Sequence, residues 1–174
     1  LQEVIKVVAE QFIALGLRFD TTNFADILAD GSWNVWISTP IQAYPAQIFI
    51  PYFKHRIFTE EDEMISSGKD FLARQYTVEE KNSFFRHFFE NTVAKNIPQA
   101  RKEYVYGANG FIRSSFRLKN IWFAIATYDG IPYSDEENAV FRRFAAVFEQ
   151  AYTRFLDLQK AEAQAREAQI EAGL

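Results

Sequence analysis

The sequence contains no cysteine. This absence excludes disulfides, thiolate zinc sites, iron–sulfur clusters, cysteine nucleophiles and thioether-linked chromophores from the segment. Histidine is almost as scarce, since His55 and His87 are the only two, which leaves little for a histidine-rich metal site. No stretch resembles a signal peptide, and no apolar run approaches the roughly 20 residues of a membrane-spanning helix. We therefore expect a soluble, cytoplasmic segment that does not itself insert into a membrane.

Basic residues are too few to create an overall positive field. The chain has 19 lysines and arginines against 23 aspartates and glutamates, a net charge of −4. This balance disfavours nucleic-acid binding. Hydrophobic residues make up 48% of the 174 residues, and 18 residues are phenylalanine, which is ample for the core of one domain. Because the chain begins without methionine and stops after a strongly helix-forming run, we expect it to be a segment of a longer protein.

The first third of the sequence predicts one helix and three strands. Apolar residues recur at helical spacing over 1–17. This seam consists of Leu1, Ile5, Val8, Phe12 and Leu15. Residues 22–39 predict two strands that meet at Asp30–Gly31, a good hairpin signal. A third strand over 47–53 should lie at a sheet edge because it contains Pro51.

Two helices and three further strands are predicted next. One helix over 59–76 opens with acidic residues, which are typical of a helix N-terminus. Another over 77–96 has Thr77 and Glu80 at the spacing of a capping box. The strands are predicted over 103–107, 110–118 and 121–128. This order favours an α+β fold with a central, mostly antiparallel sheet and helices on both faces.

A long helix is predicted at the end of the chain. Ser134 and Glu137 stand at capping-box spacing, and neither proline nor glycine occurs from Asp135 to Ala172. A helix of about 38 residues measures roughly 57 Å, so its far end should project beyond a small domain. Its heptad-like apolar positions are Phe141, Phe144, Phe148, Ala151, Phe155 and Leu158. We divide the chain into a domain over 1–134 and a C-terminal helix over 135–174 that packs on the domain and then projects as a linker.

The order of the elements resembles that of GAF-type sensor domains. The stretch FRRFAAVFEQAYTRFLDLQKAEAQAREAQIEA, residues 141–172, is similar to the helix that joins GAF-like domains to output modules in bacterial signalling proteins, especially sensor histidine kinases of two-component systems and related cyclases. The resemblance implies a sheet that binds ligands on one face, and terminal helices that pack on the other and build a parallel coiled-coil homodimer. It also implies that output catalysis lies elsewhere in the parent protein, so that this segment is not itself an enzyme.

Departures from the family pattern limit what the resemblance implies about ligands. The NKxF…DE-like signature of cyclic-nucleotide-binding members is absent, and so is the phosphoacceptor-histidine box of a kinase. Without cysteine, covalent bilin attachment and sulfoxide-reductase chemistry are excluded. The sequence therefore identifies no cofactor and no particular ligand.

The stretch SFFRHFF, residues 83–89, raises the question of a pocket. On a helix, its four phenylalanines form one broad aromatic face. We interpret it mainly as a core-facing helix with Arg86 in an exposed ion pair with Glu90. The alternative is that Arg86 or His87 lines a ligand pocket. Haem ligation by His87 is less favoured still, because a lone histidine among aromatics is more often structural.

Other pocket candidates are aromatic. The full set of pocket candidates is Trp36, Phe71, Tyr76, Phe84, His87 and Phe88. Alternation along the hairpin places Trp36 opposite Trp33, and Trp36 either faces a cavity or is an ordinary buried indole. The strand face of Trp122, Ala124, Ala126 and Tyr128 leaves room for a ligand or, as we favour, for a packed helix.

Charged residues supply weaker candidates. Arg113, Ser115 and Arg117 alternate onto one strand face, which is exposed in the interpretation we favour and binds a carboxylate or phosphate in the alternative. We attribute the acidic run 60–63 to a helix N-terminus rather than to a metal site, because consecutive residues do not share one helix face. His55 and Arg56 are predicted to lie in a loop.

Three functional hypotheses follow from the sequence. The first is a regulatory module that dimerises through its terminal helices and relays a small-molecule or conformational signal. Its dimer and relay residues would be Leu1, Ile5, Val8, Phe12, Phe141, Phe144, Phe148 and Phe155. The second is a ligand-free structural domain that dimerises and acts as a spacer. The third, a small-molecule enzyme that uses His87, lacks an identifiable second catalytic group.

Overall fold

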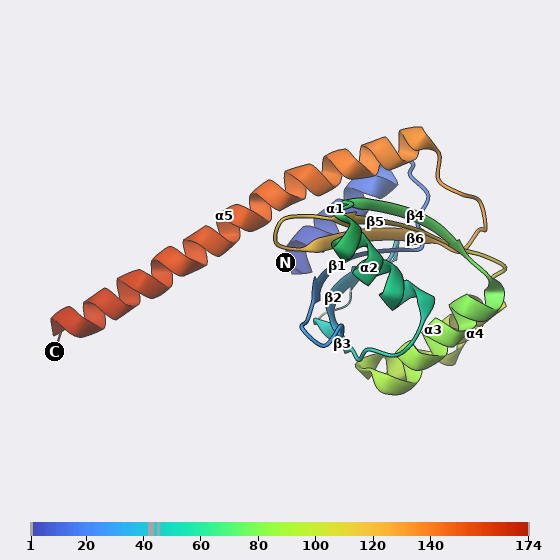
Figure 1. Ribbon diagram of the computed structural model, residues 1–174, viewed down its shortest axis with the longest axis horizontal. Coiled ribbons are helices and arrows are strands. Elements are labelled where there is room, and N and C mark those ends of the chain that lie inside the picture. Colours follow the sequence, from blue (N-terminus) through green and yellow to red (C-terminus); the bar gives the residue numbers. More distant parts are fainter. Residues whose placement is uncertain (1, 42–43, 45, 174) are drawn as a thin grey trace.

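A six-stranded antiparallel sheet forms the centre of the computed structural model (Figure 1), which describes residues 2–41, 44 and 46–173. The strands are β1 (Thr21–Ile27), β2 (Trp33–Ser38), β3 (Ile48–Ile50), β4 (Phe71–Tyr76), β5 (Phe111–Arg117) and β6 (Trp122–Thr127). Their order across the sheet is β3-β2-β1-β6-β5-β4. The predicted α+β class, the β1–β2 hairpin and the edge position of β3 are confirmed.

Helices cover both faces of the sheet. On one face lie α1 (Gln2–Ala14) and α5 (Asp135–Gly173); on the other lie α2 (Arg56–Ser67), α3 (Val78–Asn91) and α4 (Gln99–Gly107) (Figure 1). A 3-10 turn (Val93–Asn96) follows α3. Leu1, expected in the first helix, lies outside the described residues. None of the helices in the described part of the chain has both the length and the apolarity that a membrane span requires.

Strand alternation divides the aromatic residues between two cores. In β2, Trp33 is buried beneath α2, α3 and α4, whereas Trp36 packs on the opposite side with α1 and α5. In β1, Phe24 is fully buried on the α5 side, where its ring stacks on that of Phe148 with centroids 3.5 Å apart. The sheet therefore separates two aromatic cores, and its central strands contribute side chains to both.

The predicted helix over 59–76 is wrong at both ends. α2 begins at Arg56, after His55, which is its N-cap rather than a loop residue. It ends at Ser67, because the C-cap residue Gly68 has a φ of 68°, in the left-handed region that glycine adopts most easily and that stops a helix. Phe71–Tyr76 instead forms an edge strand, β4, paired with β5. The following capping box, Thr77 with Glu80, is confirmed at the start of α3.

The predicted strand over 103–107 is also wrong, because these residues form the second half of α4. Aromatic and β-branched residues favour a strand locally, but tertiary contacts outweigh that preference. Val105 is 2% exposed in the core beneath the sheet. Lys81, which is fully buried, donates hydrogen bonds from Nζ to the carbonyl oxygens of Val105, at 2.6 Å, and Ala108. A cation from α3 thus stabilises the C-terminal end of α4.

The long C-terminal helix is confirmed. α5 contains 39 residues and measures about 59 Å at ~1.5 Å per residue. Its first half packs on the sheet through residues that include Phe141, Ala145, Phe148 and Tyr152. Every residue over 157–173 is exposed. Figure 1 shows the exposed C-terminal half of α5 projecting past the sheet, on the side where α1 begins.

Candidate functional site

An aromatic cavity lies between the sheet and helices α2, α3 and α4. Its volume is about 70 Å³. Six rings form much of its wall, contributed by Trp33, Phe84, Phe85, Phe88, Phe89 and Phe111. Small and aliphatic side chains such as Val35, Val105 and Ala126 leave the space open between them. By the same kind of measure a single water requires roughly 10–15 Å³, so this cavity has room for more than one.

Polar groups interrupt the aromatic wall. Thr21, Asn23, Tyr44, Arg101 and Tyr128 all line the cavity. Burial raises the pKa of Tyr44 and of Tyr128, and in both cases the positive charge of Arg101 opposes that rise. The positive charge of Arg101 therefore acts on both hydroxyl groups.

Arg101 lacks a carboxylate partner in the described part of the chain. Its guanidinium carbon lies 5.0 Å from the centre of the ring of Tyr104, which is half exposed. The side chain is half-buried. An arginine in this position keeps its donors available to a molecule in the cavity.

The second arginine of the cavity, Arg113, is neutralised inside the protein. Its Nη1 lies 2.7 Å from Oε1 of Glu61, and the two side chains are only 8% and 2% exposed. The guanidinium carbon also lies 5.4 Å from the centre of the Trp33 ring. Oε2 of Glu61 is buried and has no hydrogen-bond partner among the described residues. Burial raises the pKa of Glu61, while Arg113 opposes the rise.

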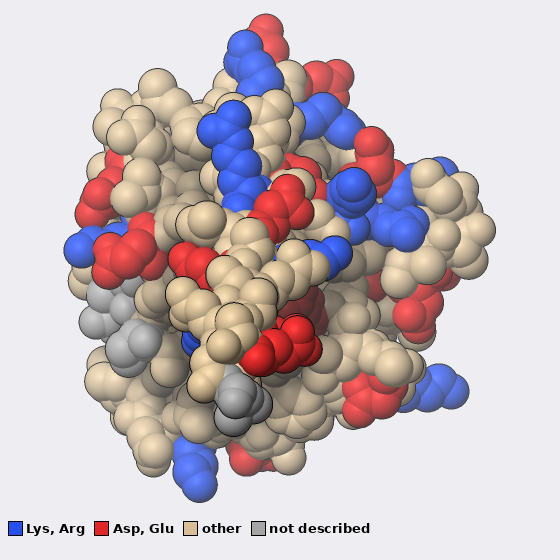
Figure 2. Space-filling view, turned by 90° about the vertical axis from the view of Figure 1, so that its left-hand side faces the viewer, with Lys and Arg blue, Asp and Glu red and all other residues tan. Residues whose placement is uncertain are grey.

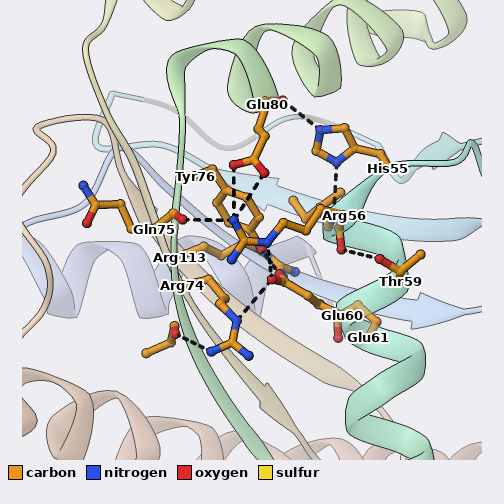
Figure 3. Close-up of polar contacts among 12 residues, drawn as sticks. His55, Arg56, Thr59, Glu60, Glu61, Arg74, Gln75, Tyr76, Glu80 and Arg113 are labelled. Carbon is orange, nitrogen blue, oxygen red and sulfur yellow. Dashed lines mark hydrogen bonds and ion pairs between the residues drawn. The ribbon is translucent and has the colours of Figure 1, made fainter.

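A cluster of charged residues continues from this pair toward the surface (Figure 3). Glu60 is 4% exposed and binds Nε of Arg56 at 2.7 Å, Nε of Arg74 at 3.1 Å and the hydroxyl group of Tyr76. Arg56 also contacts Glu80 of α3 at 3.3 Å. Through these contacts one acidic residue joins α2 to β4, while Arg56 joins α2 to α3. These ion pairs and hydrogen bonds hold α2 and α3 in place beside the cavity.

This cluster corrects two expectations. Glu60 and Glu61 do not stand at a helix N-terminus, because α2 begins at Arg56 and both residues lie in its second turn. Consecutive positions point them at different partners: Glu60 at Arg56 and Arg74, and Glu61 at Arg113. On the strand face of Arg113, Ser115 and Arg117, the first two residues are likewise buried rather than exposed, whereas Arg117 is exposed as expected. The carboxylate that Arg113 binds belongs to Glu61. No three metal-ligating side chains gather anywhere in the described residues.

The six pocket candidates from the sequence do not share one site. Phe84 and Phe88 line the cavity, and Tyr76 belongs to the same core but binds Glu60. Trp36 and Phe71 lie across the sheet in the other core, so neither reaches the cavity. The parity of a strand predicts which residues share a face, but only the packed helices decide which face carries the cavity.

His87 is held by the loop after β3, outside the cavity lining. Its Nε2 lies 2.6 Å from the carbonyl oxygen of Pro51, and its ring stacks on Phe53 with centroids 3.9 Å apart. The neighbouring Arg86 is exposed, and no ion pair among the described residues joins it to Glu90. SFFRHFF is thus mainly a packing helix: its phenylalanines face the cavity, and its polar residues face outward or hold the edge loop.

The sequence reasoning missed Arg101, Asn23 and Lys81. Arg101 lies in α4, just before residues that were predicted as a strand, so no helical pattern indicated its direction. Asn23 lies in the hairpin strand β1, and its alternation with Thr21 was a usable signal. Lys81 had no local signal, because its carbonyl partners are 24 to 27 residues away in the chain.

His55 makes the start of α2 sensitive to pH. Its Nδ1 accepts the Ile57 N–H at 3.1 Å, so Nε2 carries the proton that it donates to the Glu80 carbonyl oxygen at 2.8 Å. Burial lowers the pKa of His55, so between that pKa and the ordinary value of about 6.5 the unfolded chain binds more protons. We expect the free energy of unfolding to fall as the pH decreases through this window.

The variant His55→Asn tests the cap and its titration together. Asparagine keeps an acceptor at the N-cap but does not titrate. We expect His55→Ala to lose about 1 kcal/mol at pH 7.5, and His55→Asn to lose less and to show a flatter pH dependence between pH 7.5 and 5. The measurement is chemical denaturation at several pH values. An unchanged slope in His55→Asn would show that other groups cause the pH dependence.

Comparison of the chain with protein-family models, curated proteins and solved structures finds no match. The chemistry of the site is therefore the basis for inferring a function. What the site offers is an apolar aromatic space, one guanidinium without a carboxylate partner, and hydroxyl and amide groups beside it. Burial keeps the tyrosines protonated at neutral pH, because it raises their pKa, so they act as hydrogen-bond donors.

Proposed function

We propose that this chain is a GAF-like sensory module that binds a small molecule in the aromatic cavity and relays a signal through α5 to an output domain, of the histidine kinase or cyclase type, elsewhere in a parent chain. One observation carries the proposal: a single sheet separates the cavity from the helices α1 and α5. In β6, Ala126 lines the cavity, while its neighbour Ile125 is fully buried on the α5 side. A shift of β6 would therefore move side chains both in the cavity wall and in the core against which α5 packs.

The proposed homodimer would use the outer surface of α5. Val147, Phe155 and Leu158 are exposed by 67%, 43% and 60%. A second α5 packed alongside would bury these apolar side chains. On the projecting half, basic and acidic side chains alternate with small ones, and Figure 2 shows both signs interspersed on the face toward which α5 extends. Such a mixed surface favours a paired helix over a lone membrane- or nucleic-acid-binding arm.

Most of the residues expected to form the dimer pack inside the domain instead. Ile5, Val8 and Phe12 of α1 are buried in the same core as Phe141 and Phe148 of α5, and Phe144 packs against it. Of the described residues in this set, only Phe155 is exposed, by 43%. These buried residues would act in the proposed relay by coupling α5 to the sheet, and the exposed stripe would make the contact between copies.

A continuous set of contacts supports the proposed relay. Asp20 accepts the Tyr128 N–H at 2.7 Å beside the cavity. From the same turn, Arg18 binds Asp129 and Glu137, the latter at 3.2 Å in the first turn of α5. Tyr133 donates its hydroxyl proton to the Arg18 carbonyl oxygen at 2.9 Å. For a ligand to shift the populations of two arrangements of α5, it must interact differently with each of them.

The variant Phe155→Glu/Leu158→Glu tests the dimer. We expect the native chain to sediment as a dimer and the double variant as a monomer, because like charges would face each other along the seam. The thermal midpoint of the domain should change little, since both side chains are exposed. Gln159→Glu/Lys160→Gln, on the same helix, is the control and should remain dimeric. A native chain that stays monomeric at high concentration in analytical ultracentrifugation would contradict the proposal.

The tight packing around the cavity also favours the second function, a ligand-free dimerisation and spacer domain. The six aromatic rings leave only about 70 Å³ between them. Native mass spectrometry of the purified chain separates the two functions. A dimer with additional mass that is lost on denaturation would support the sensory module, whereas an apo dimer that binds no small molecule would support the spacer.

A further inference from the structure

We infer that the cavity recognises a short-chain monocarboxylate, with its carboxylate on Arg101 and its hydrocarbon tail among the phenylalanines of α3. The inference rests on the proposed ligand-binding function and adds the chemical class of the ligand. The charge of the cavity lining, the hydrogen-bond donors in it and the size of the cavity support the inference.

The charges of the residues that line the cavity favour a ligand with one negative charge. The lining residues include two arginines and, among those described, no aspartate or glutamate. Glu61 neutralises Arg113 at 2.7 Å. Arg101 is left as the one cation of the lining without a carboxylate, so a monoanion balances the site and a cation is repelled. A dianion would bring one charge too many into an apolar space.

The donors around Arg101 suit a carboxylate. A guanidinium binds the two oxygens of a carboxylate through parallel N–H bonds. Asn23 lines the same cavity, and its side chain forms no hydrogen bond with another described residue. Tyr44 and Tyr128 add hydroxyl groups on which the charge of Arg101 acts. These groups together can satisfy both oxygens of one carboxylate.

The volume of the cavity limits the length of the ligand's hydrocarbon tail. At about 70 Å³ the cavity is less than half as large as the roughly 150 Å³ engineered cavity that holds benzene. A nucleotide, a haem or a bilin does not fit this space, whereas an acid of about three to five carbons does. Each methylene that enters the aromatic space should tighten binding about three- to fourfold. The gain should stop once the cavity is full.

Isothermal titration calorimetry of the native chain with sodium butyrate, butyramide and butylammonium chloride tests the charge. The three probes have similar shapes but carry a negative, a neutral and a positive head. We expect butyrate to bind at least tenfold more tightly than butyramide, and butylammonium not to bind. In the series acetate, propionate, butyrate and valerate, affinity should rise by the factor per methylene given above and then level off.

Two matched variants locate the charge. Arg101→Gln removes the proposed anchor from a half-buried position, and we expect it to lose the preference for butyrate over butyramide. Arg86→Gln removes the same charge from an exposed position on α3 that does not line the cavity, and it should bind butyrate like the native chain. Ala126→Leu, which fills the cavity from the sheet, should abolish binding of both probes.

The outcomes separate the inference from the proposed function. Equal affinity for butyrate and butyramide, abolished by Ala126→Leu, would overturn the carboxylate inference and leave a ligand-binding cavity. Butyrate binding that survives Arg101→Gln would also overturn it. If no probe binds, the carboxylate inference fails, and the presence or absence of retained mass in native mass spectrometry then decides the ligand-binding function on its own.

Discussion

The variant Arg113→Met is expected to lower the free energy of unfolding by about 3–5 kcal/mol. The change leaves Glu61 in a site where its side chain is only 2% exposed, with no cation in contact. Its Oε2 already lacks a partner among the described residues. Methionine retains much of the volume of arginine, so the loss would come mainly from the unpaired carboxylate rather than from a cavity.

The pH dependence of this variant distinguishes charge from packing. Without Arg113, the pKa of Glu61 should rise further, because Arg113 is what opposes the effect of burial. A carboxyl group whose pKa is raised in the folded state favours folding at low pH and loses that contribution as the pH rises through the folded pKa. Urea denaturation should therefore show a larger loss at pH 8 than at pH 5.

Two controls accompany Arg113→Met. Arg113→Met/Glu61→Leu removes both charges and should recover much of the stability, because a buried ion pair can often be replaced by apolar side chains. Arg74→Met removes a surface partner of Glu60, which keeps Arg56 and Tyr76, and should have a much smaller effect. A loss below about 1 kcal/mol in Arg113→Met would show that the pair contributes little to folding.

The second large effect is expected for Lys81→Met, at about 2–4 kcal/mol. Lys81 is fully buried, and its Nζ donates to the carbonyl oxygens of Val105 at 2.6 Å, Tyr106 at 3.4 Å and Ala108. The last carbonyl groups of a helix have no partner within the helix. Methionine occupies the same space but donates no hydrogen bond, so these carbonyl groups would stay buried and unsatisfied.

Hydrogen exchange locates the effect of Lys81→Met as well as its size. We expect the amides of α4 to exchange faster than those of β1 and β6, because the end of α4 loses its cap. Lys95→Met, which changes an exposed lysine in the turn after α3, is the control and should leave exchange and stability unchanged. Uniformly faster exchange across the sheet would argue that Lys81 supports the whole core rather than the end of one helix.

Elements with a local signal were predictable from the sequence. Gly31, with a φ of 84°, allows the turn between β1 and β2. Thr77 and Glu80 form both bonds of the capping box at the start of α3. The absence of helix breakers after Ser134 predicted the whole of α5. In each case, residues within a few positions of one another decide the conformation, so the chain order is sufficient.

The site was predictable only in part. Phe84 and Phe88 were identified because four phenylalanines at helical spacing must bury one face. Trp36 and Phe71 were named as pocket candidates but lie in the other core, because alternation does not say which face of a strand meets the cavity, and Phe71 was predicted in a helix rather than in β4. Arg101, now the proposed anchor, was overlooked because the residues after it were predicted as a strand.

The sequence by itself determined the class of fold, the pairing of the hairpin and the length of the last helix. These depend on spacing, turn residues and composition, which act over short distances along the chain. Tertiary structure alone decided that Glu61 meets Arg113 across 52 residues and that Lys81 caps a helix from another element. Burial makes such contacts necessary, because a charge that is removed from water is costly without a partner. The tertiary fold determines which partner lies near it. The cavity beside them exists for the same reason: its walls come from strands and helices that meet only when the chain is folded.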